Sequence, residues 1–249
     1  MNVATILAGG TGVRFGGEIP KQYTPVCGKP LLAYTLETFQ SSTAIDFIQV
    51  VCRPEYNETV RSMAVKYGID KLKWITGAGN NCPESIRNSV YALQDTMSGD
   101  DCFILHMGVS PLVTHDDIES AIALCREKGC SFTMHPVNIC LARKCSDGWT
   151  DKDAPKENYI ELNTPWAFMY SGILELYQEL NRCGRTLGES DYTLTLWLAS
   201  GRRAYYSPGS SIGRLKITTA QDMEMFEGYL LLKRIRQIQV ESDRLGGIV

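Results

Sequence analysis

Apolar runs rich in β-branched residues alternate with amphipathic segments along most of the chain, and this alternation restricts the fold more than any other feature of the sequence. The pattern predicts strands over residues 3–7, 47–52, 72–75, 102–105 and 131–137. Between them it predicts helices over residues 30–39, 55–67, 85–93 and 116–127. Strands separated by helices in this way are typical of an α/β fold with a mostly parallel sheet, helices on both faces and right-handed crossovers.

The alternation is interrupted once, over residues 138–159. This stretch is rich in charged and turn-forming residues and has no strong period of its own, which is usual for a functional segment or part of an interface. After it, the sequence predicts helices over 171–181, 192–199 and 219–239 and strands over 203–206 and 215–217. The length of 249 residues and the absence of repeats favour a single domain, residues 1–249, with residues 138–159 as an excursion from it.

Two of the predicted helices begin with a capping signal. Thr114 is followed three residues later by Asp117, and Thr219 is followed in the same way by Asp222. In such a pair, the hydroxyl and the carboxylate satisfy backbone N–H groups that a helix leaves unpaired at its start. We therefore expect a helix to begin just after each threonine.

The net charge of the chain disfavours some classes of binding partner. The 25 basic and 28 acidic residues leave a net charge of −3, which disfavours general binding to nucleic acid or to an anionic membrane. No apolar span approaches the roughly 20 residues that a transmembrane helix needs, and the chain begins with a strand-like run instead of a signal peptide. We expect a cytoplasmic protein with no membrane and no nucleic-acid partner.

The nine cysteines indicate reduced thiols. Their number is odd and no CxxC motif occurs, so they do not form a recognisable disulfide framework. The pairs Cys125/Cys130 and Cys140/Cys145 have the wrong spacing for a tetrahedral zinc site and no histidine at ligand spacing. Mostly buried thiols in a reducing compartment are the expectation.

The first predicted strand ends in a glycine-rich loop, Ala8-Gly9-Gly10-Thr11-Gly12-Val13-Arg14-Phe15-Gly16-Gly17. Glycines let backbone amides approach a phosphate closely, and the arginine adds positive charge. A Walker loop is excluded because no Gly-Lys-Ser/Thr follows, and the dinucleotide fingerprint is poor because Phe15 stands where its third glycine belongs. A loop that merely turns the chain is the alternative interpretation.

Two further motifs favour phosphate binding. Pro20-Lys21-Gln22-Tyr23 follows the glycine loop, and Gly28-Lys29-Pro30-Leu31 precedes the next helix. A loop that brings Arg14 and Lys21 together around amide donors is suited to hold a triphosphate and to stabilise charge that develops at phosphorus. Lys21 alone would be read as a solvated surface lysine, so the inference depends on the linked spacing of the three motifs.

These motifs resemble those of the cytidylyltransferases that activate methylerythritol phosphate, in isoprenoid biosynthesis, or ribitol phosphate, within the wider class of nucleotide-diphospho-sugar transferases. The resemblance is specific over residues 7–39 and continues at Gly77 to Ile86, His106 to Pro111, Asn163-Thr164-Pro165, Ser190-Asp191 and Leu215 to Thr219. It implies a doubly wound, Rossmann-like sheet, a protruding arm at residues 138–159, and a homodimer formed through that arm.

The resemblance also implies a reaction and a set of site residues. The phosphate of a sugar or polyol phosphate attacks the α-phosphorus of CTP, and pyrophosphate leaves. By resemblance, the catalytic cations are Arg14, Lys21 and Lys216, and the nucleotide pocket is lined by Ala8, Gly9, Gly10, Thr11, Gly12, Gly79 and Ser85. Weaker candidates for acceptor binding are Lys156 on the arm, Thr164, Ser190 and Asp191. Mg²⁺ is expected with CTP.

The sequence departs from the family where a metal would be bound. The family's His-Asp-x-x-Arg-Pro motif reads His-Met-Gly-Val-Ser-Pro, so Met107 and Ser110 replace its aspartate and arginine. Asn80 and Cys82 stand where acidic and arginine residues are common. A thioether is a poor ligand for a hard cation such as Mg²⁺, so the protein's metal ligands are not identified by the sequence.

Three accounts of function follow from this mixture. In the first, the protein is a cytidylyltransferase whose Mg²⁺ is held chiefly by the triphosphate and water. In the second, it is a catalytically weakened paralogue that binds nucleotide or regulates a partner. The third, a dinucleotide-dependent reductase on the same fold, is disfavoured by the missing third glycine.

Overall fold

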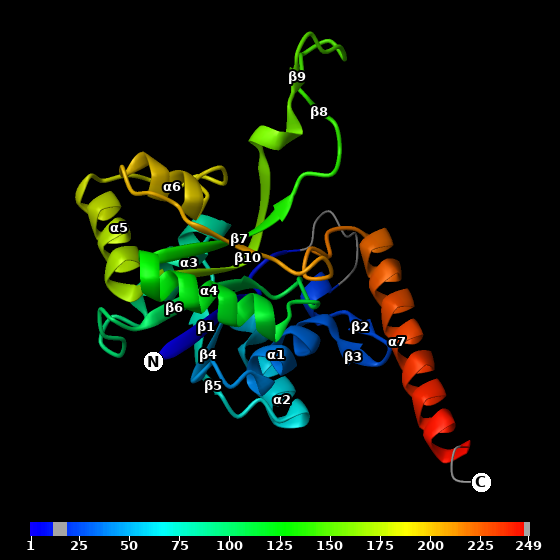
Figure 1. Ribbon diagram of the computed structural model, residues 1–249. Coiled ribbons are helices and arrows are strands. Elements are labelled where there is room, and N and C mark those ends of the chain that lie inside the picture. The colour runs from blue at the N-terminus through cyan, green and yellow to red at the C-terminus, as the bar shows by residue number, and fades with distance from the viewer. Residues whose placement is uncertain (12–18, 247–249) are drawn as a thin grey trace.

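The computed structural model describes residues 1–11 and 19–246, with side chains described up to residue 243. A seven-stranded sheet forms its centre, in the order β11-β7-β10-β6-β1-β4-β5 (Figure 1). The strands are β1 (Asn2–Leu7), β4 (Phe47–Cys52), β5 (Leu72–Gly77), β6 (Cys102–Met107), β7 (Cys130–Pro136), β10 (Ile160–Met169) and β11 (Tyr206–Pro208). Within this sheet, as far as the structure describes it, only the pairings of β10 with β6 and β7 are antiparallel, so the expected mostly parallel sheet is confirmed.

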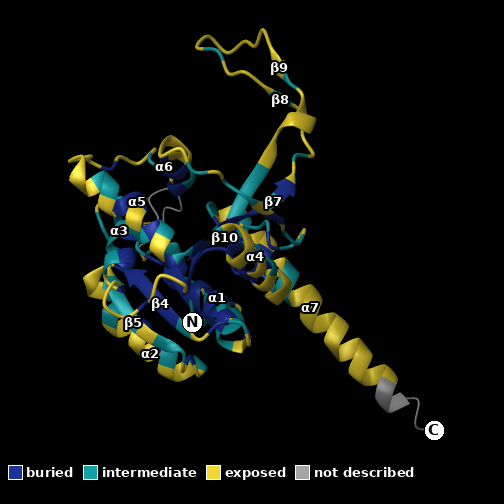
Figure 2. Ribbon diagram, turned by 60° about the vertical axis from the view of Figure 1, so that its left-hand side comes forward, coloured by how far each residue is buried: buried dark blue, intermediate teal, exposed yellow. Residues whose placement is uncertain are grey.

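Helices cover both faces of this sheet because successive side chains of a strand point to opposite sides. In β1, Ala4 and Ile6 pack with α1 (Leu31–Ser41), α2 (Asn57–Tyr67) and α4 (His115–Lys128). Val3 and Leu7 belong to a second apolar cluster with α3 (Cys82–Tyr91), α5 (Tyr170–Arg182) and α6 (Thr193–Ala199). The buried core therefore lies on each side of the central strands, as Figure 2 shows.

The remaining elements are short or peripheral. The hairpin β2 (Pro25–Val26)/β3 (Lys29–Pro30) precedes α1, and η1 (Lys21–Tyr23) and η2 (Pro54–Tyr56) are single turns. The last helix, α7 (Ala220–Gly246), packs its first turns on a third apolar cluster through Met223 and Phe226. From residue 231 to 243 every residue of α7 is exposed, and the helix projects from the body (Figure 2).

Residues 137–159 leave the body between β7 and β10. They carry the two-residue strands β8 (Leu141–Ala142) and β9 (Asp153–Ala154), which pair antiparallel, and the single turn η3 (Lys156–Asn158). In Figure 1 this hairpin stands away from the sheet and its helices. Most of its residues are exposed.

Four interpretations of the sequence are corrected. Residues 215–217 do not form a strand, and the strand expected at 203–206 is β11, at Tyr206–Pro208. The long strand β10 was missed because Pro165 lies inside it, and proline argues against a central strand; the register shift between Asn163 and Trp166 accommodates this residue. All nine cysteines are free, but only four are buried, so the expectation of mostly buried thiols is wrong.

Both capping signals form as expected. Thr114 Oγ1 accepts from the backbone N–H of Asp117, and the Asp117 carboxylate accepts from the N–H of Thr114. At the start of α7, Asp222 accepts from the N–H groups of Thr218 and Thr219, 2.7 Å in each case. These bonds satisfy donors that each helix would otherwise leave unpaired.

Candidate functional site

The glycine loop after β1 is held by hydrogen bonds from the segment that follows it. The side-chain amide of Gln22 donates to the carbonyl oxygens of Ala8 and Gly10, each at 2.7 Å, and Gln22 is almost fully buried. The Tyr23 hydroxyl donates to the same Ala8 oxygen at 3.3 Å. With the carbonyls of Ala8 and Gly10 turned toward Gln22, Gly10 and Thr11 are exposed at the end of β1. Gly12 and Arg14 lie outside the described residues.

A second loop, between β5 and α3, packs directly against the first. A Cβ added to Gly9 would lie 2.5 Å from the Cβ of Ala78, so only glycine permits this approach. Gly79 is equally constrained, since its Cβ would lie 2.3 Å from the Cβ of Glu84. Ser85, 7 % exposed, accepts from the Gly79 N–H at 3.0 Å and donates to the Asn81 carbonyl at 2.8 Å. Its hydroxyl therefore shapes this loop.

Lys21 connects the first loop to residues 215–219, which are far away in sequence. Its Nζ donates to the carbonyl oxygen of Ile217 at 2.7 Å. Burial alone would raise the pKa of Asp222, at the start of α7, but hydrogen bonds from Thr219 and Thr218, together with the charge of Lys21, lower that pKa. Lys21 therefore contributes positive charge beside the segment that carries Lys216.

Lys216 itself is exposed between two anchored neighbours. Ile217 is fully buried among Val109, Phe226 and other apolar residues, and Leu215 packs against the same cluster. The Cys82 residue at the start of α3 is exposed, but surrounding protein atoms partly exclude water from its thiol and raise its pKa, and the charge of Lys216 opposes that rise. The charge of Lys216 therefore acts at the start of α3. The bond from the Ile217 N–H to the Val109 carbonyl, just after β6, places this segment at the carboxyl edge of the parallel strands, where α/β sheets bind ligands.

Residues 106–111 add no charge to this edge. Met107 packs in an apolar environment, and Ser110 is fully buried with no hydrogen-bond partner for its hydroxyl. Within residues 1–11 and 19–246, no group of three or more His, Cys, Asp or Glu side chains could hold a metal ion. The thioether that replaces a carboxylate here does not suit Mg²⁺, so the described residues do not fit a protein-bound magnesium ion.

His106 in this segment is a buried neutral group. It is fully buried, its Nε2 lies 3.0 Å from the Ser110 carbonyl, and its Nδ1 has no partner. Burial lowers its pKa from 6.5 to about 4, although the Ser110 bond and Asp117 act in the opposite direction. In the unfolded chain the His106 ring binds a proton at about pH 6.5. Above that pH the ring is neutral in both states, so its protonation does not reduce the free energy of unfolding.

We expect the free energy of unfolding to fall as the pH drops from about 6.5 to about 4, because only the unfolded state then gains the proton. The His106 contribution is on the order of 3 kcal/mol. His106→Gln, whose amide can still donate to the Ser110 carbonyl, should flatten this pH dependence in urea unfolding experiments. Equal slopes for the two proteins would contradict the assignment.

The expected acceptor residues are dispersed. Thr164 is 4 % exposed, and its hydroxyl accepts from the Met107 N–H at 3.3 Å, so it joins β10 to the end of β6. Asp191 bonds to Arg185 at 2.6 Å and to the Gly188 N–H at 2.8 Å, and Ser190 is exposed beside it. Their loop is tied to the start of α3 by a bond from Asn81 Nδ2 to the Leu187 carbonyl.

Lys156 lies in η3, on the projecting segment, and is exposed. The structure therefore brings together Lys21, the described part of the first loop, the second loop and the segment around Lys216. Lys156 is not among them, because the segment that carries it projects from the body (Figure 1). Sequence reasoning did not single out Gln22 or Asn163. In the sequence, only their positions inside the Pro-Lys-Gln-Tyr and Asn-Thr-Pro motifs indicate that Gln22 and Asn163 belong to the site.

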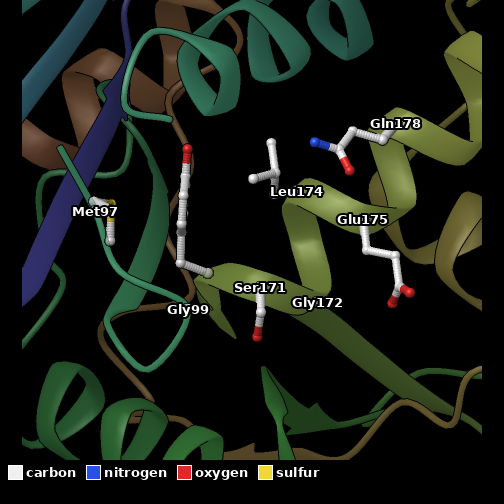
Figure 3. A pocket seen from close by; sticks show the side chains of 8 residues that line it. Met97, Gly99, Ser171, Gly172, Leu174, Glu175 and Gln178 are labelled. Atoms are coloured by element: carbon white, nitrogen blue, oxygen red, sulfur yellow. The ribbon is translucent and has the colours of Figure 1, made fainter. Parts of the chain in front are cut away.

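A separate cavity of about 460 Å³ lies at the start of α5 (Figure 3). Its lining includes Met97, Tyr170, Leu174, Gln178 and the carboxylate of Glu175. The lining contains no lysine or arginine, and a carboxylate repels anions. This cavity does not suit a triphosphate.

Comparisons with known proteins identify related sequences. The sequence profile of the family described as IspD, 2-C-methyl-D-erythritol 4-phosphate cytidylyltransferase, matches residues 2–231. A ribitol-5-phosphate cytidylyltransferase of Lacticaseibacillus paracasei is 34% identical over 235 residues, covering 94% of this chain and all of the relative. A 2-C-methyl-D-erythritol 4-phosphate cytidylyltransferase of Geobacter metallireducens is 32% identical over 228 residues, covering 91% of this chain and 96% of the relative.

Solved structures support the fold. The 4-diphosphocytidyl-2C-methyl-D-erythritol synthase of Anaerococcus prevotii superimposes with a TM-score of 0.77 at 21% identity, covering 92% of this chain and 96% of that one. A 2-C-methyl-D-erythritol 4-phosphate cytidylyltransferase of Francisella tularensis superimposes with a TM-score of 0.70 at 21% identity, covering 90% and 97%. In the part of the chain that the structure describes, no helix is both long enough and apolar enough to cross a membrane.

Proposed function

The chain belongs to the 2-C-methyl-D-erythritol 4-phosphate cytidylyltransferase family, and from that premise we propose that the two packed loops and residues 215–219 form its CTP site. The protein transfers a cytidylyl group from CTP to a sugar phosphate and releases pyrophosphate. The single observation that supports this location is the bond from Lys21 Nζ to the carbonyl of Ile217, beside Lys216.

Cytidylyl transfer requires positive charge and amide donors around the phosphates. An acceptor phosphate oxygen forms a bond to the α-phosphorus of CTP while the bond to the pyrophosphate oxygen breaks, and negative charge builds up on the oxygens at phosphorus. In our proposal, the amides of residues 9–12 and Arg14 hold the triphosphate, and Lys21 adds positive charge. The Ala8 N–H donates to the Val51 carbonyl instead, so Ala8 contributes its position and not its amide. A lysine ammonium has three donors, so Lys21 can bind a phosphate while it keeps its bond to Ile217. Lys216 stabilises the charge at the α-phosphate.

Magnesium is expected with CTP, but the described residues supply no ligand set for it. Among the protein groups, the lysines and the backbone amides therefore stabilise the charge on the phosphates. The cytoplasmic location expected from the sequence stays a prediction.

The acceptor is proposed to bind beside the second loop, near Ser190 and Asp191. Relatives that match this chain over nine-tenths of its length are named for ribitol 5-phosphate and for 2-C-methyl-D-erythritol 4-phosphate, both phosphorylated polyols. In this proposal Gly79 and Ser85 shape the CTP pocket and Thr164 shapes the acceptor pocket, since the hydroxyls of Ser85 and Thr164 bond to backbone groups.

We expect pyrophosphate release from CTP in the presence of Mg²⁺ and one of these two polyol phosphates. The assay compares ribitol 5-phosphate, 2-C-methyl-D-erythritol 4-phosphate and unphosphorylated ribitol, the last as the control that lacks the attacking group. The second candidate is a weakened paralogue, favoured by Met107 and by the buried Ser110 in place of a charged pair. A rise in melting temperature with CTP, but no pyrophosphate with any acceptor, would support that candidate and contradict transfer.

The projecting arm is proposed to form a homodimer and to place Lys156 at the partner's acceptor site. Mixing two inactive variants tests this directly. In the proposed dimer each site uses Lys216 of one chain and Lys156 of its partner. When Lys156→Ala and Lys216→Ala chains reassociate at random, about half of the dimers are mixed and each mixed dimer has one intact site, so about a quarter of all sites should be active. No recovery of activity, with both proteins dimeric by light scattering, would contradict a shared site.

A further inference from the structure

Asp117 is a buried carboxylate that holds two separate parts of the molecule. It is 3 % exposed and accepts from the backbone N–H of Thr114 at 2.9 Å, which caps α4. It also accepts from Ser210 twice, from the backbone N–H at 2.6 Å and from the hydroxyl at 2.7 Å. Burial alone would raise the pKa of Asp117, but these hydrogen bonds outweigh it and lower the pKa, so the carboxylate is charged at neutral pH.

The two bonds to Ser210 are not needed to cap a helix. A capping box requires only the exchange between Thr114 and Asp117. Ser210 belongs instead to the segment between β11 and α7, 93 residues later in the chain. An ionised carboxylate with three close donors is a strong anchor, because breaking one bond leaves a buried charge less well compensated.

The segment closes around this carboxylate. Gly213 donates its N–H to the Ser210 hydroxyl at 3.1 Å, and that hydroxyl in turn donates to Asp117. A Cβ added to Gly213 would lie 2.7 Å from Asp117 Oδ2 and 2.8 Å from Ser210 Oγ, so no other residue fits without movement. Asp117 thus fixes the turn over residues 210–213.

Lys216 follows this turn by three residues and is fixed on its other side as well. The Ile217 N–H donates to the Val109 carbonyl at 2.8 Å, and the Asn163 amide donates to the carbonyls of Gly213 and Arg214, at 3.3 and 3.1 Å. The exposed Lys216 therefore lies on a short segment whose beginning is attached to Asp117 and whose end is attached to Val109, just after β6, and to the core.

We propose that Asp117 is a positioning residue for cytidylyl transfer: through Ser210 and Gly213 it sets the place of Lys216 at the reacting phosphate. This inference rests on the role given above to Lys216. Displacement of a catalytic group by about 1 Å can lower a rate by about two orders of magnitude, so loss of one anchor should reduce kcat.

The test uses variants on the two sides of the carboxylate. Ser210→Ala removes a hydroxyl from the segment and leaves the α4 cap intact, whereas Thr114→Ala removes a cap acceptor and leaves Ser210 in place. We expect Ser210→Ala to lower kcat about tenfold, with kcat/KM falling equally. Thr114→Ala should lower the melting temperature and leave kcat at the wild-type value. Gly213→Ala, a second disturbance of the same turn, should lower kcat as Ser210→Ala does.

A double-mutant cycle with Lys216→Ala tests the role of Lys216 separately from the positioning role of Asp117. If Ser210 acts through Lys216, adding Ser210→Ala to Lys216→Ala should lower kcat no further. An independent tenfold loss in that background, or an equal loss of kcat in Thr114→Ala, would overturn the positioning role. A Lys216→Ala enzyme with wild-type kcat would instead overturn the proposed role of Lys216. Wild-type kcat in Ser210→Ala beside an inactive Lys216→Ala would overturn the positioning role alone.

Discussion

Lys216→Ala is expected to lower kcat for cytidylyl transfer by about 10²- to 10³-fold, the range measured when one preorganised donor to a developing oxyanion is removed. The side chain is exposed, and its segment is held by backbone bonds and by buried Ile217. Its loss should therefore change the melting temperature little. Because the proposed interaction strengthens as charge develops at phosphorus, kcat and kcat/KM should fall together.

A matched control is available on α2. Lys66 is an exposed lysine on α2, near the ring of Tyr67, and lies far from the proposed phosphate site in sequence. Lys66→Ala should retain wild-type kinetics in the same pyrophosphate-release assay. A Lys216→Ala enzyme whose kcat equals that of Lys66→Ala would remove Lys216 from the reaction.

Lys21→Ala is expected to weaken CTP binding by about 10- to 100-fold, as for loss of one charge-assisted hydrogen bond. It should also lower kcat, because the bond from Lys21 Nζ to the Ile217 carbonyl attaches the first loop to the segment that carries Lys216. Calorimetric titration with CTP measures the first effect and single-turnover kinetics the second.

Lys29 offers the comparison for this variant. It belongs to the neighbouring Gly-Lys-Pro motif, but its ammonium pairs with Glu37 at 2.5 Å. Lys29→Ala should leave the CTP dissociation constant unchanged. If Lys21→Ala binds CTP as tightly as Lys29→Ala does, Lys21 has no part in holding the triphosphate.

The sequence predicted the parallel strands because each is a short apolar run flanked by a turn and a helix. It did not predict β10, whose run contains Pro165, Asn163 and Glu161 and therefore lacks the apolar signature of a buried strand. Residues 215–217 gave the opposite error. Leu215 and Ile217 are apolar because they anchor Lys216 to a core cluster, and no neighbouring strand pairs with them among the described residues.

For the candidate site, local motifs identified the segments but not the bonds between them. The hydrogen bonds of Gln22 to the glycine loop and of Lys21 to Ile217 depend on how distant segments meet. Asp117 is the clearest case. Its sequence context predicts a helix cap, and nothing local indicates that the same carboxylate also binds Ser210.

The central claim is tested most directly by a crystal structure of the protein with CTP. The account predicts a triphosphate within hydrogen-bond distance of Lys21 Nζ and the backbone amides of Gly9 to Thr11, with the α-phosphate facing Lys216. A triphosphate bound elsewhere, or bound with both lysine side chains turned away from it, would contradict the account.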